Sequence, residues 1–268
     1  MIDFGKQNIL GVGINAVNYE AAVDKIIDAA HAKKPFGVSA LAVHGVMTGA
    51  LDANHRHRLN KLDLVVPDGH PVRWAISWLY NINLPDRVYG PNLTLEVCQK
   101  AAEEGLGIFL YGSQSAVLGK FEKNLKAKFP KLIIAGKQES LFRQVTAQEQ
   151  LEIAEKIEKS GASIVFVGLG CPRQETWVFE NRSLISMPLM AVGAAFDFHA
   201  GTVSQAPKWM QDRGLEWFYR FIQEPKRLWQ RYVYLNPLYL IMVGLQFLNI
   251  RTQAIDDAFA PTEQKRFG

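Results

Sequence analysis

Short apolar runs alternate along most of the chain with longer amphipathic stretches, and this alternation limits the fold more than any other feature. Six apolar runs predict strands: Gly37–Val43, Leu62–Val66, Gly107–Leu110, Lys131–Ala135, Ala162–Val167 and Leu189–Val192. Helical periodicity fills the stretches Tyr19–Ala32, Pro91–Glu104, Ser115–Lys128 and Ala147–Ser160. Uninterrupted apolar strands are typical of a parallel sheet covered on both faces, and intervening helices supply the crossovers. The pattern therefore predicts an α/β fold with a mostly parallel, Rossmann-like sheet flanked by helices.

Composition narrows the class of protein further. Apolar residues make up 48% and charged residues 21% of the 268 residues, a balance that excludes a disordered chain. Two cysteines cannot form a disulfide framework, and the N-terminus has no basic region followed by an apolar run. We expect a protein kept in the cytosol.

A change in composition near residue 206 predicts the end of the α/β core, which we place at residues 1–205. Residues 206–268 are predicted to form a helical appendage. Between Lys208 and Arg251 there are seven basic residues against three acidic ones, and three of the six tryptophans. Basic and aromatic residues together suit a nucleic acid, a phosphate-bearing ligand or an anionic membrane surface. A solvated helix with a buried aromatic stripe would give the same pattern.

The appendage contains an apolar segment, Tyr232–Ile250, that would be about 28 Å long as a helix. Asn236 and Pro237 interrupt it, and Arg231 and Arg251 flank its ends. We predict that the segment lies in the membrane interface, with a membrane span and a buried core helix as alternatives. Because the basic stretch is short and leads into this segment, a membrane-bound phosphate ligand is favoured over nucleic acid.

Several predicted strands end in polar loops, and ligands of open α/β sheets bind at the carboxyl ends of the strands. Asp68 follows one strand between a proline and a glycine, where it is a candidate general base. The alternative is that Asp68 only caps the helix that begins near Pro71. Gly112 precedes another helix, whose N-terminal N–H groups could bind a diphosphate.

Two further loops carry candidate binding residues. Gly168 begins a run with Gln174 and Glu175 that could bind a nucleotide and a sugar, although it lacks the dinucleotide glycine fingerprint. Cys171, in the same run, is interpreted as a small loop residue, because no base is placed beside it. Asp197 lies between two phenylalanines in a segment that, if extended, would point its carboxylate away from them. Its carboxylate could accept a hydrogen bond from a sugar hydroxyl, or it could accept hydrogen bonds within a buried loop.

No metal site is predicted. His55 and His57 are interpreted as residues of a charged helical surface without a third ligand, and no Asp-x-Asp pair is present. Arginines would then neutralise a diphosphate. Arg220, Arg227 and Arg231 share one helical face if Pro225 does not break the register.

The chain resembles the WecG/TagA/CpsF glycosyltransferase family over roughly Leu10 to Tyr234. The matching motifs are V-P-D-G at Val66–Gly69, R-V-Y-G-P-N-L at Arg87–Leu93, F-L-Y-G-S at Phe109–Ser113, G-L-G-C-P-R-Q-E at Gly168–Glu175, A-V-G-A-A-F-D-F-H-A-G at Ala191–Gly201, and a long run at Ala206–Tyr232. The last three, in this order and spacing, are highly specific together.

The resemblance implies an inverting, metal-independent transfer of a sugar from a UDP-sugar to a polyprenyl-diphosphate-linked saccharide. It implies work at the inner face of a bacterial cytoplasmic membrane, in cell-surface polysaccharide or teichoic acid synthesis. The sequence leaves open whether the protein is a monomer or a homo-oligomer. Asp68 matches the family's proposed base, and Arg87 and Gln174 match residues proposed to contact substrate. The appendage would complete the site and reach the membrane.

One motif departs from the family pattern. Family members commonly have Thr-x-Asn where this chain has Ser39-Ala40-Leu41, and His44 follows. His44 could replace the lost amide as a hydrogen-bonding or titrating group near Asp68. Alternatively, it is a histidine of the following helix whose hydrogen bonds are made within the protein. The change leaves the donor open between an N-acetylmannosamine-type sugar and a hexose such as glucose. A nicotinamide-dependent oxidoreductase and a non-catalytic membrane-associated nucleotide-binding protein are the alternatives from other classes.

Overall fold

The computed structural model describes residues 1–255, 260–261 and 264–268. Its central sheet has six parallel strands in the order β4-β3-β8-β7-β5-β6. The strands are β3 (Phe36–Leu41), β4 (Leu64–Pro67), β5 (Gly107–Gly112), β6 (Ile133–Gln138), β7 (Ile164–Gly168) and β8 (Pro188–Ala191). All six predicted strands and the parallel sheet are confirmed.

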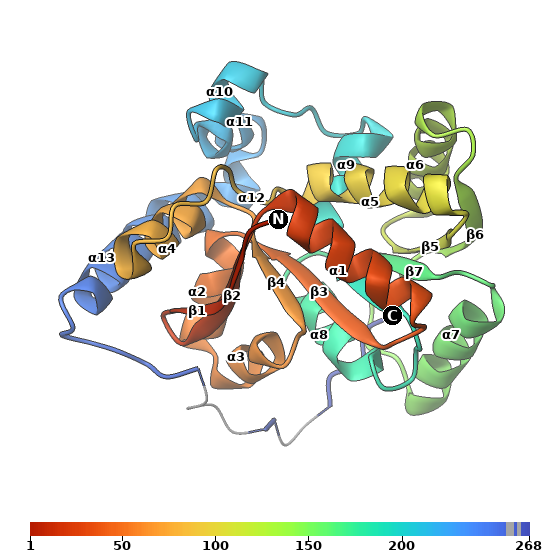
Figure 1. Ribbon diagram of the computed structural model, residues 1–268, viewed down its shortest axis with the longest axis horizontal. Coiled ribbons are helices and arrows are strands. Elements are labelled where there is room, and N and C mark those ends of the chain that lie inside the picture. Colours follow the sequence, from red (N-terminus) through yellow and green to blue (C-terminus); the bar gives the residue numbers. More distant parts are fainter. Residues whose placement is uncertain (256–259, 262–263) are drawn as a thin grey trace.

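Helices cover both faces of the sheet (Figure 1). One face is covered by α1 (Tyr19–His31), α5 (Gly90–Glu104), α6 (Ser115–Lys128) and α9 (Gly193–Ala200). The other is covered by α2 (Val43–Leu51), α3 (Ala53–Asn60), α4 (His70–Tyr80), α7 (Ala147–Lys159) and α8 (Arg173–Asn181). The four predicted helices are confirmed, because each stretch has an apolar stripe at helical spacing that the sheet buries.

An N-terminal hairpin precedes this sheet and was not predicted. Its strands β1 (Asp3–Ile9) and β2 (Val12–Val17) are antiparallel, and the turn between them has positive φ at Leu10 and Gly11. The Asn15 side chain accepts a hydrogen bond from the Val65 N–H at 2.8 Å. The hairpin thus packs against β4, the edge strand that leads into the candidate base.

The stretch predicted to form the appendage contains α10 (Lys208–Asp212), α11 (Glu216–Gln223), α12 (Pro225–Trp229), the π-helix η1 (Gln230–Leu235) and α13 (Asn236–Phe247). The division of the chain at residue 206 stays a prediction, and the name appendage is kept for these helices. In α13, which contacts α2 and α4, Tyr239 and Val243 are buried in the same cluster as the core. The Tyr239 hydroxyl donates to the Pro71 carbonyl at 3.1 Å. No helix in residues 1–255 is both long enough and apolar enough to cross a bilayer.

The last residues return to the core. Phe267 forms a β-bridge with Gln144, and the Phe142 N–H donates to the Gly268 carbonyl at 3.1 Å. The C-terminus therefore lies close to α7 and α8, at the opposite side of the molecule from α13 (Figure 1).

Candidate active site

Asp68 comes directly after β4, and the sheet register fixes its place. Leu41 of β3 pairs with Pro67, and the Asp68 N–H donates to the Leu41 carbonyl at 3.3 Å. The N-cap of α4 is Gly69, without a side-chain cap, so the interpretation of Asp68 as the cap of that helix is wrong. Its carboxylate instead accepts the Gly90 N–H of α5 at 3.2 Å.

The appendage brings a second carboxylate to Asp68. Glu216, in α11, accepts a hydrogen bond from the Arg87 guanidinium at 2.7 Å and from the Tyr89 hydroxyl at 2.6 Å. The Arg87 and Glu216 side chains are only 10% and 9% exposed, so this ion pair is largely shielded from water. Arg87 also lies over the Tyr89 ring, 4.2 Å from its centre.

These charges act on Asp68. Burial is the largest effect and raises the pKa of Asp68 to about 6, with Glu216 adding to the rise. Arg87, the Gly90 N–H and Arg220 oppose it. A carboxyl with this pKa is mostly ionised at neutral pH and is basic enough to accept a proton during a reaction.

Arg220 belongs to this group, since its guanidinium lies 5.4 Å from the centre of the Phe198 ring and its charge acts on Asp68. The shared helical face of Arg220, Arg227 and Arg231 is expected only if Pro225 keeps the helical register, and the structure does not meet this condition. Glu224 leaves helical geometry, with φ −134° and ψ 57°, and Pro225 begins a new helix. The side chains of Arg227 and Arg231 lie outside the described part of the chain, and their role stays a prediction.

A second polar group lies between β3 and α8. Glu175 is fully buried, and one of its oxygens accepts from Ser39 Oγ at 3.2 Å and from the Gln174 amide at 2.8 Å. The Gln174 carbonyl oxygen accepts the Gly170 and Gly193 N–H groups at 3.1 and 2.9 Å. Three of the predicted binding residues therefore form one network that fixes the loops after β7 and β8.

The predicted glycines are packed rather than open. Gly112 has φ +106°, and a Cβ there would lie 2.9 Å from the Gly168 backbone. The Ser113 N–H, next to Gly112, already donates to the Gly168 carbonyl at 3.0 Å. Asp197 lies in helix α9, not in an extended segment, and its carboxylate accepts from the Thr202 hydroxyl at 3.2 Å. Substrate binding by these three residues stays a prediction.

The prediction that His55 is a surface residue is wrong. Helix α3, capped by Asp52, packs against α2 and α8, and His55 points inward with only 3% of its surface exposed. Burial lowers the pKa of His55 to about 4, and the charge of His44 contributes to the lowering. The expectation that His55 has no further metal ligands nearby is also wrong. His55, Cys171 and Glu175 each place one potential metal-ligand atom within 4.8 Å of the others.

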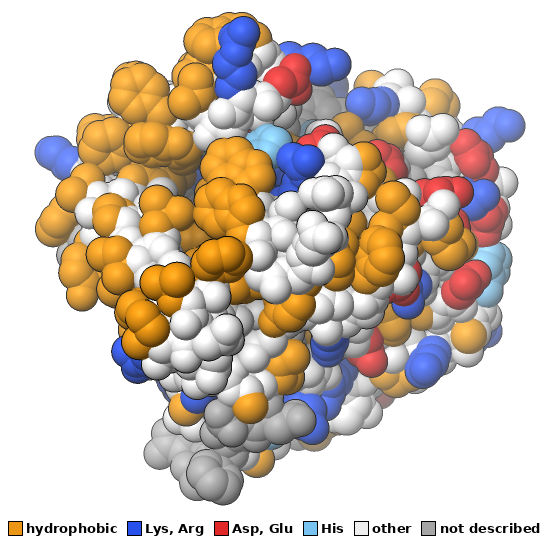
Figure 2. Space-filling model, turned by 60° about the vertical axis from the view of Figure 1, so that its left-hand side comes forward, with side chains coloured by type: hydrophobic (Ala, Val, Ile, Leu, Met, Phe, Trp, Pro, Cys, Tyr) orange, Lys and Arg blue, Asp and Glu red, His pale blue; other side chains and the backbone are white. Residues whose placement is uncertain are grey.

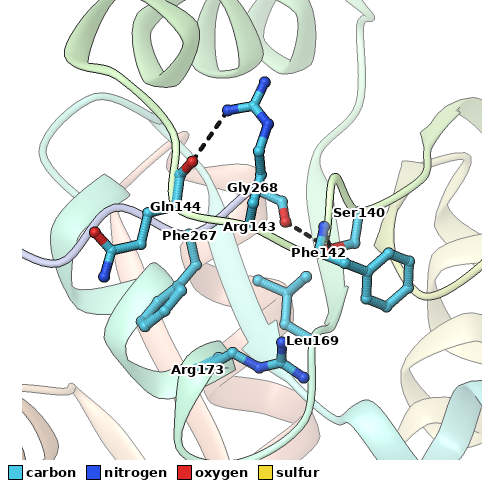
Figure 3. A pocket seen from close by; sticks show the side chains of 8 residues that line it. All are labelled: Ser140, Phe142, Arg143, Gln144, Leu169, Arg173, Phe267 and Gly268. Atoms are coloured by element: carbon cyan, nitrogen blue, oxygen red, sulfur yellow. Dashed lines mark hydrogen bonds between the residues drawn. The ribbon is translucent and has the colours of Figure 1, made fainter.

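A pocket of about 200 Å³ lies beyond β6 and β7 and shares no residue with the Asp68 group. Figure 3 shows Leu169 between Arg173 on one side and the docked C-terminal residues on the other. The Arg143 guanidinium lies at the far end from Arg173, where it donates to the Gln144 carbonyl at 3.0 Å.

Hydrophobic side chains gather on the face formed by α4 and the appendage (Figure 2). We call these exposed side chains the apolar surface: Trp74, Trp78, Trp209, Trp217, Phe218, Ile222, Trp229, Val233, Tyr234, Leu240, Ile241, Phe247, Leu248 and Ile250. The rings of Trp74 and Trp78 in α4 stack with their centres 6.4 Å apart. They extend the apolar surface onto the core, an extension that the sequence did not predict. Patches of this kind mark sites of protein or membrane contact.

Comparison with known proteins identifies the reaction class. The model of the WecG/TagA/CpsF glycosyl transferase family matches residues 7–253, nearly the whole chain. The chain belongs to this family. One relative, the N-acetylglucosaminyldiphosphoundecaprenol N-acetyl-beta-D-mannosaminyltransferase of Bacillus subtilis (strain 168), is 31% identical over 202 residues, which cover 75% of this chain and 76% of the relative. The protein is thus a glycosyltransferase, neither an oxidoreductase nor a non-catalytic binding protein.

Two residues of this glycosyltransferase's site escaped the sequence analysis. Tyr89 lies within the motif that begins at Arg87, and Glu216 is one of three acidic residues in the basic stretch. An acid isolated among arginines is a signal for an ion pair, but its partner lies 129 residues away and cannot be read from local spacing.

Proposed function

We propose that this glycosyltransferase moves a sugar from a UDP-sugar to a polyprenyl-diphosphate-linked saccharide, with inversion and without a metal ion at the diphosphate. The donor sugar is of the N-acetylmannosamine type or another hexose, and UDP-glucose is the second candidate because Leu41 stands where the family commonly has asparagine. The name of the Bacillus relative supports the lipid-linked acceptor. The observation that carries the proposal is Asp68, at a strand's carboxyl end with a pKa of about 6 and two arginine charges acting on it.

In this mechanism Asp68 removes the proton from the acceptor hydroxyl. The oxygen then attacks the anomeric carbon, and UDP leaves from the opposite face of the sugar. Arg220 lies on the appendage side of Asp68, where a guanidinium can stabilise negative charge on the leaving diphosphate. Arg87 is held by Glu216 and Tyr89, which fixes its guanidinium beside the base.

The pKa of Asp68 predicts how the rate depends on pH. The base works only when ionised, and its pKa is raised to about 6. We therefore expect kcat/KM to be constant above pH 7 and to fall about tenfold per pH unit well below 6. Initial rates at acceptor-lipid concentrations well below KM, measured between pH 4.5 and 8.5, give this fall at acidic pH, the acid limb of the rate profile. A rate that stays constant down to pH 4.5 would show that another group is the base.

Calorimetric titration of UDP into the detergent-purified protein tests the donor and the metal independence together. We expect binding that EDTA does not reduce and that added Mg²⁺ does not strengthen, with no binding of NAD. Binding that requires Mg²⁺ or Mn²⁺ would contradict a metal-free diphosphate site, and no UDP binding even with acceptor lipid present would contradict the donor. A screen of UDP-sugars on a polyprenyl-linked acceptor then decides between N-acetylmannosamine and glucose.

We further propose that the apolar surface holds the enzyme at the inner face of the cytoplasmic membrane, where its lipid-linked acceptor lies. Helix α13 supports an interfacial position, because Tyr239 and Val243 face the core while Leu240 and Ile241 are more than half exposed. The flanking basic residues suit anionic lipid headgroups.

The double variant Ile241→Asp with Leu248→Asp tests this membrane contact. Both side chains are more than 60% exposed, so their replacement should leave folding intact. Each apolar side chain withdrawn from a membrane loses about 1.5–3 kcal/mol, so vesicle binding should weaken by more than about 100-fold. Co-sedimentation with phosphatidylglycerol-containing vesicles measures it. The control, Leu151→Asp, changes an exposed leucine on α7 at the far side of the molecule and should bind as the wild type does. Equal binding of the double variant would place the contact elsewhere.

A further inference from the structure

Three potential metal ligands, one from α3 and two from the segment that leads into α8, lie close together. They are the imidazole of His55 in α3, the thiol of Cys171 in the loop after β7, and the carboxylate of Glu175 in α8. One ligand atom from each lies within 4.8 Å of the other two. None of the three belongs to the Asp68 group, and the proposed transfer reaction uses none of their reactive atoms.

Two of these atoms are buried without a partner. Within the described residues, neither His55 Nε2 nor Glu175 Oε2 has a hydrogen-bond partner, although the two side chains are 3% and 0% exposed. A buried polar atom that makes no hydrogen bond costs about 1–3 kcal/mol, so a ligand shared by these two side chains would offset that cost. Burial raises the pKa of Glu175, and a side-chain hydrogen bond with Cys171 is among the contacts that oppose this rise.

The other oxygen of Glu175 is already held. Ser39 Oγ and the Gln174 amide donate to Oε1, so Oε2 is the oxygen that is left available for a ligand. Metal-binding carboxylates are commonly oriented by hydrogen bonds of this kind. The Glu175 carboxylate is therefore already oriented by its neighbours.

We propose that His55, Cys171 and Glu175 bind a zinc-type divalent ion, with the fourth coordination position open to water or to the loop. Imidazole nitrogen, thiolate sulfur and carboxylate oxygen are the three ligand types of Zn²⁺. Ligands at zinc distances from a tetrahedral ion are about 3.3–3.8 Å apart, so contractions of about 1 Å suffice. A neutral imidazole, a thiolate and a carboxylate also balance the ion's two charges, which avoids leaving net charge in the protein interior.

When the ion binds, the Cys171 thiol loses its proton to solvent and the resulting thiolate coordinates the ion. The ion would then tie α3 to α8 and fix the loop that carries Gly170, whose N–H donates to the Gln174 side chain of α8. It would act on structure, and none of its three ligands has a role in the proposed transfer step, so the cobalt titration below tests the ion and not the reaction.

Cobalt titration of the full-length, metal-stripped protein under a non-thiol reductant tests the site. Co²⁺ bound to a thiolate gives a near-ultraviolet charge-transfer band and, when four-coordinate, intense visible bands. We expect these bands to saturate at one equivalent and to disappear when Zn²⁺ is added. In Cys171→Ser the near-ultraviolet band should be lost. In His55→Gln cobalt should bind more than about 100-fold more weakly, since loss of an outer-shell partner alone costs 10–100-fold.

Matched controls come from the same chain. Cys98→Ala removes the other cysteine, which is buried in α5, and leaves Cys171 as the sole thiol, so its band can be assigned even if Cys171→Ser does not fold. His57→Gln changes the neighbouring histidine of α3 and should keep the bands. A wild-type protein that gives no thiolate-to-cobalt band overturns the proposal, as does a band that persists in a folded Cys171→Ser variant.

Discussion

Replacement of Asp68 by asparagine should reduce kcat by about 10²–10⁴-fold, the contribution that a positioned general base usually makes. Asparagine has nearly the same shape and can still accept the Gly90 N–H bond, so the loop between β4 and α4 should keep its conformation. The variant loses only the ability to take a proton. UDP affinity, measured by calorimetry, should therefore stay near that of the wild type.

The control is Asp28→Asn, which changes an exposed acid on α1 and should leave kcat unaltered. A second measurement separates base catalysis from a general loss of negative charge. The acid limb of the rate profile near pH 6 should vanish in Asp68→Asn, because the titrating group is gone. If Asp68→Asn kept full turnover with an unchanged acid limb, Asp68 would not be the base.

Replacement of Glu216 by alanine should have the second largest effect, because it leaves Arg87 buried without its ionic partner. Breaking one side of a buried ion pair costs about 3–5 kcal/mol, and this pair is at most 10% exposed. We expect the free energy of unfolding in urea to fall by roughly 3 kcal/mol. Transfer should slow as well, since the freed guanidinium no longer has a fixed position beside Asp68.

The conservative variant Glu216→Gln separates position from charge. Glutamine can still accept from the Tyr89 hydroxyl, but it removes a negative charge that raises the pKa of Asp68. The acid limb should therefore move to lower pH, while stability falls less than in the alanine variant. Asp212→Asn, an exposed acid in the same appendage, should change neither property. A Glu216→Ala variant with wild-type stability and rate would mean that α11 does not close on the core in solution.

The agreement between sequence and structure is close for the elements that bury one face against the sheet. The helix α6 has the predicted bounds, and each of the six predicted strands is present, because apolar periodicity reports burial directly. The loop positions followed from the strands, since every parallel strand delivers its carboxyl end to the same edge. That rule placed Asp68 correctly, although local spacing alone favoured a helix cap.

The sequence by itself determined the α/β class, the strands and crossover helices, the family and the candidate base. Only the tertiary structure decided which side chains meet. Three features depend on contacts between elements distant along the chain: the pairing of Glu216 with Arg87, the inward position of His55, and the position of Trp74 next to Gly214. Apolar periodicity predicts that a helix has a buried face. Which residues that face contacts depends on how the helices pack in three dimensions. The charge and polarity of a site arise from those neighbours.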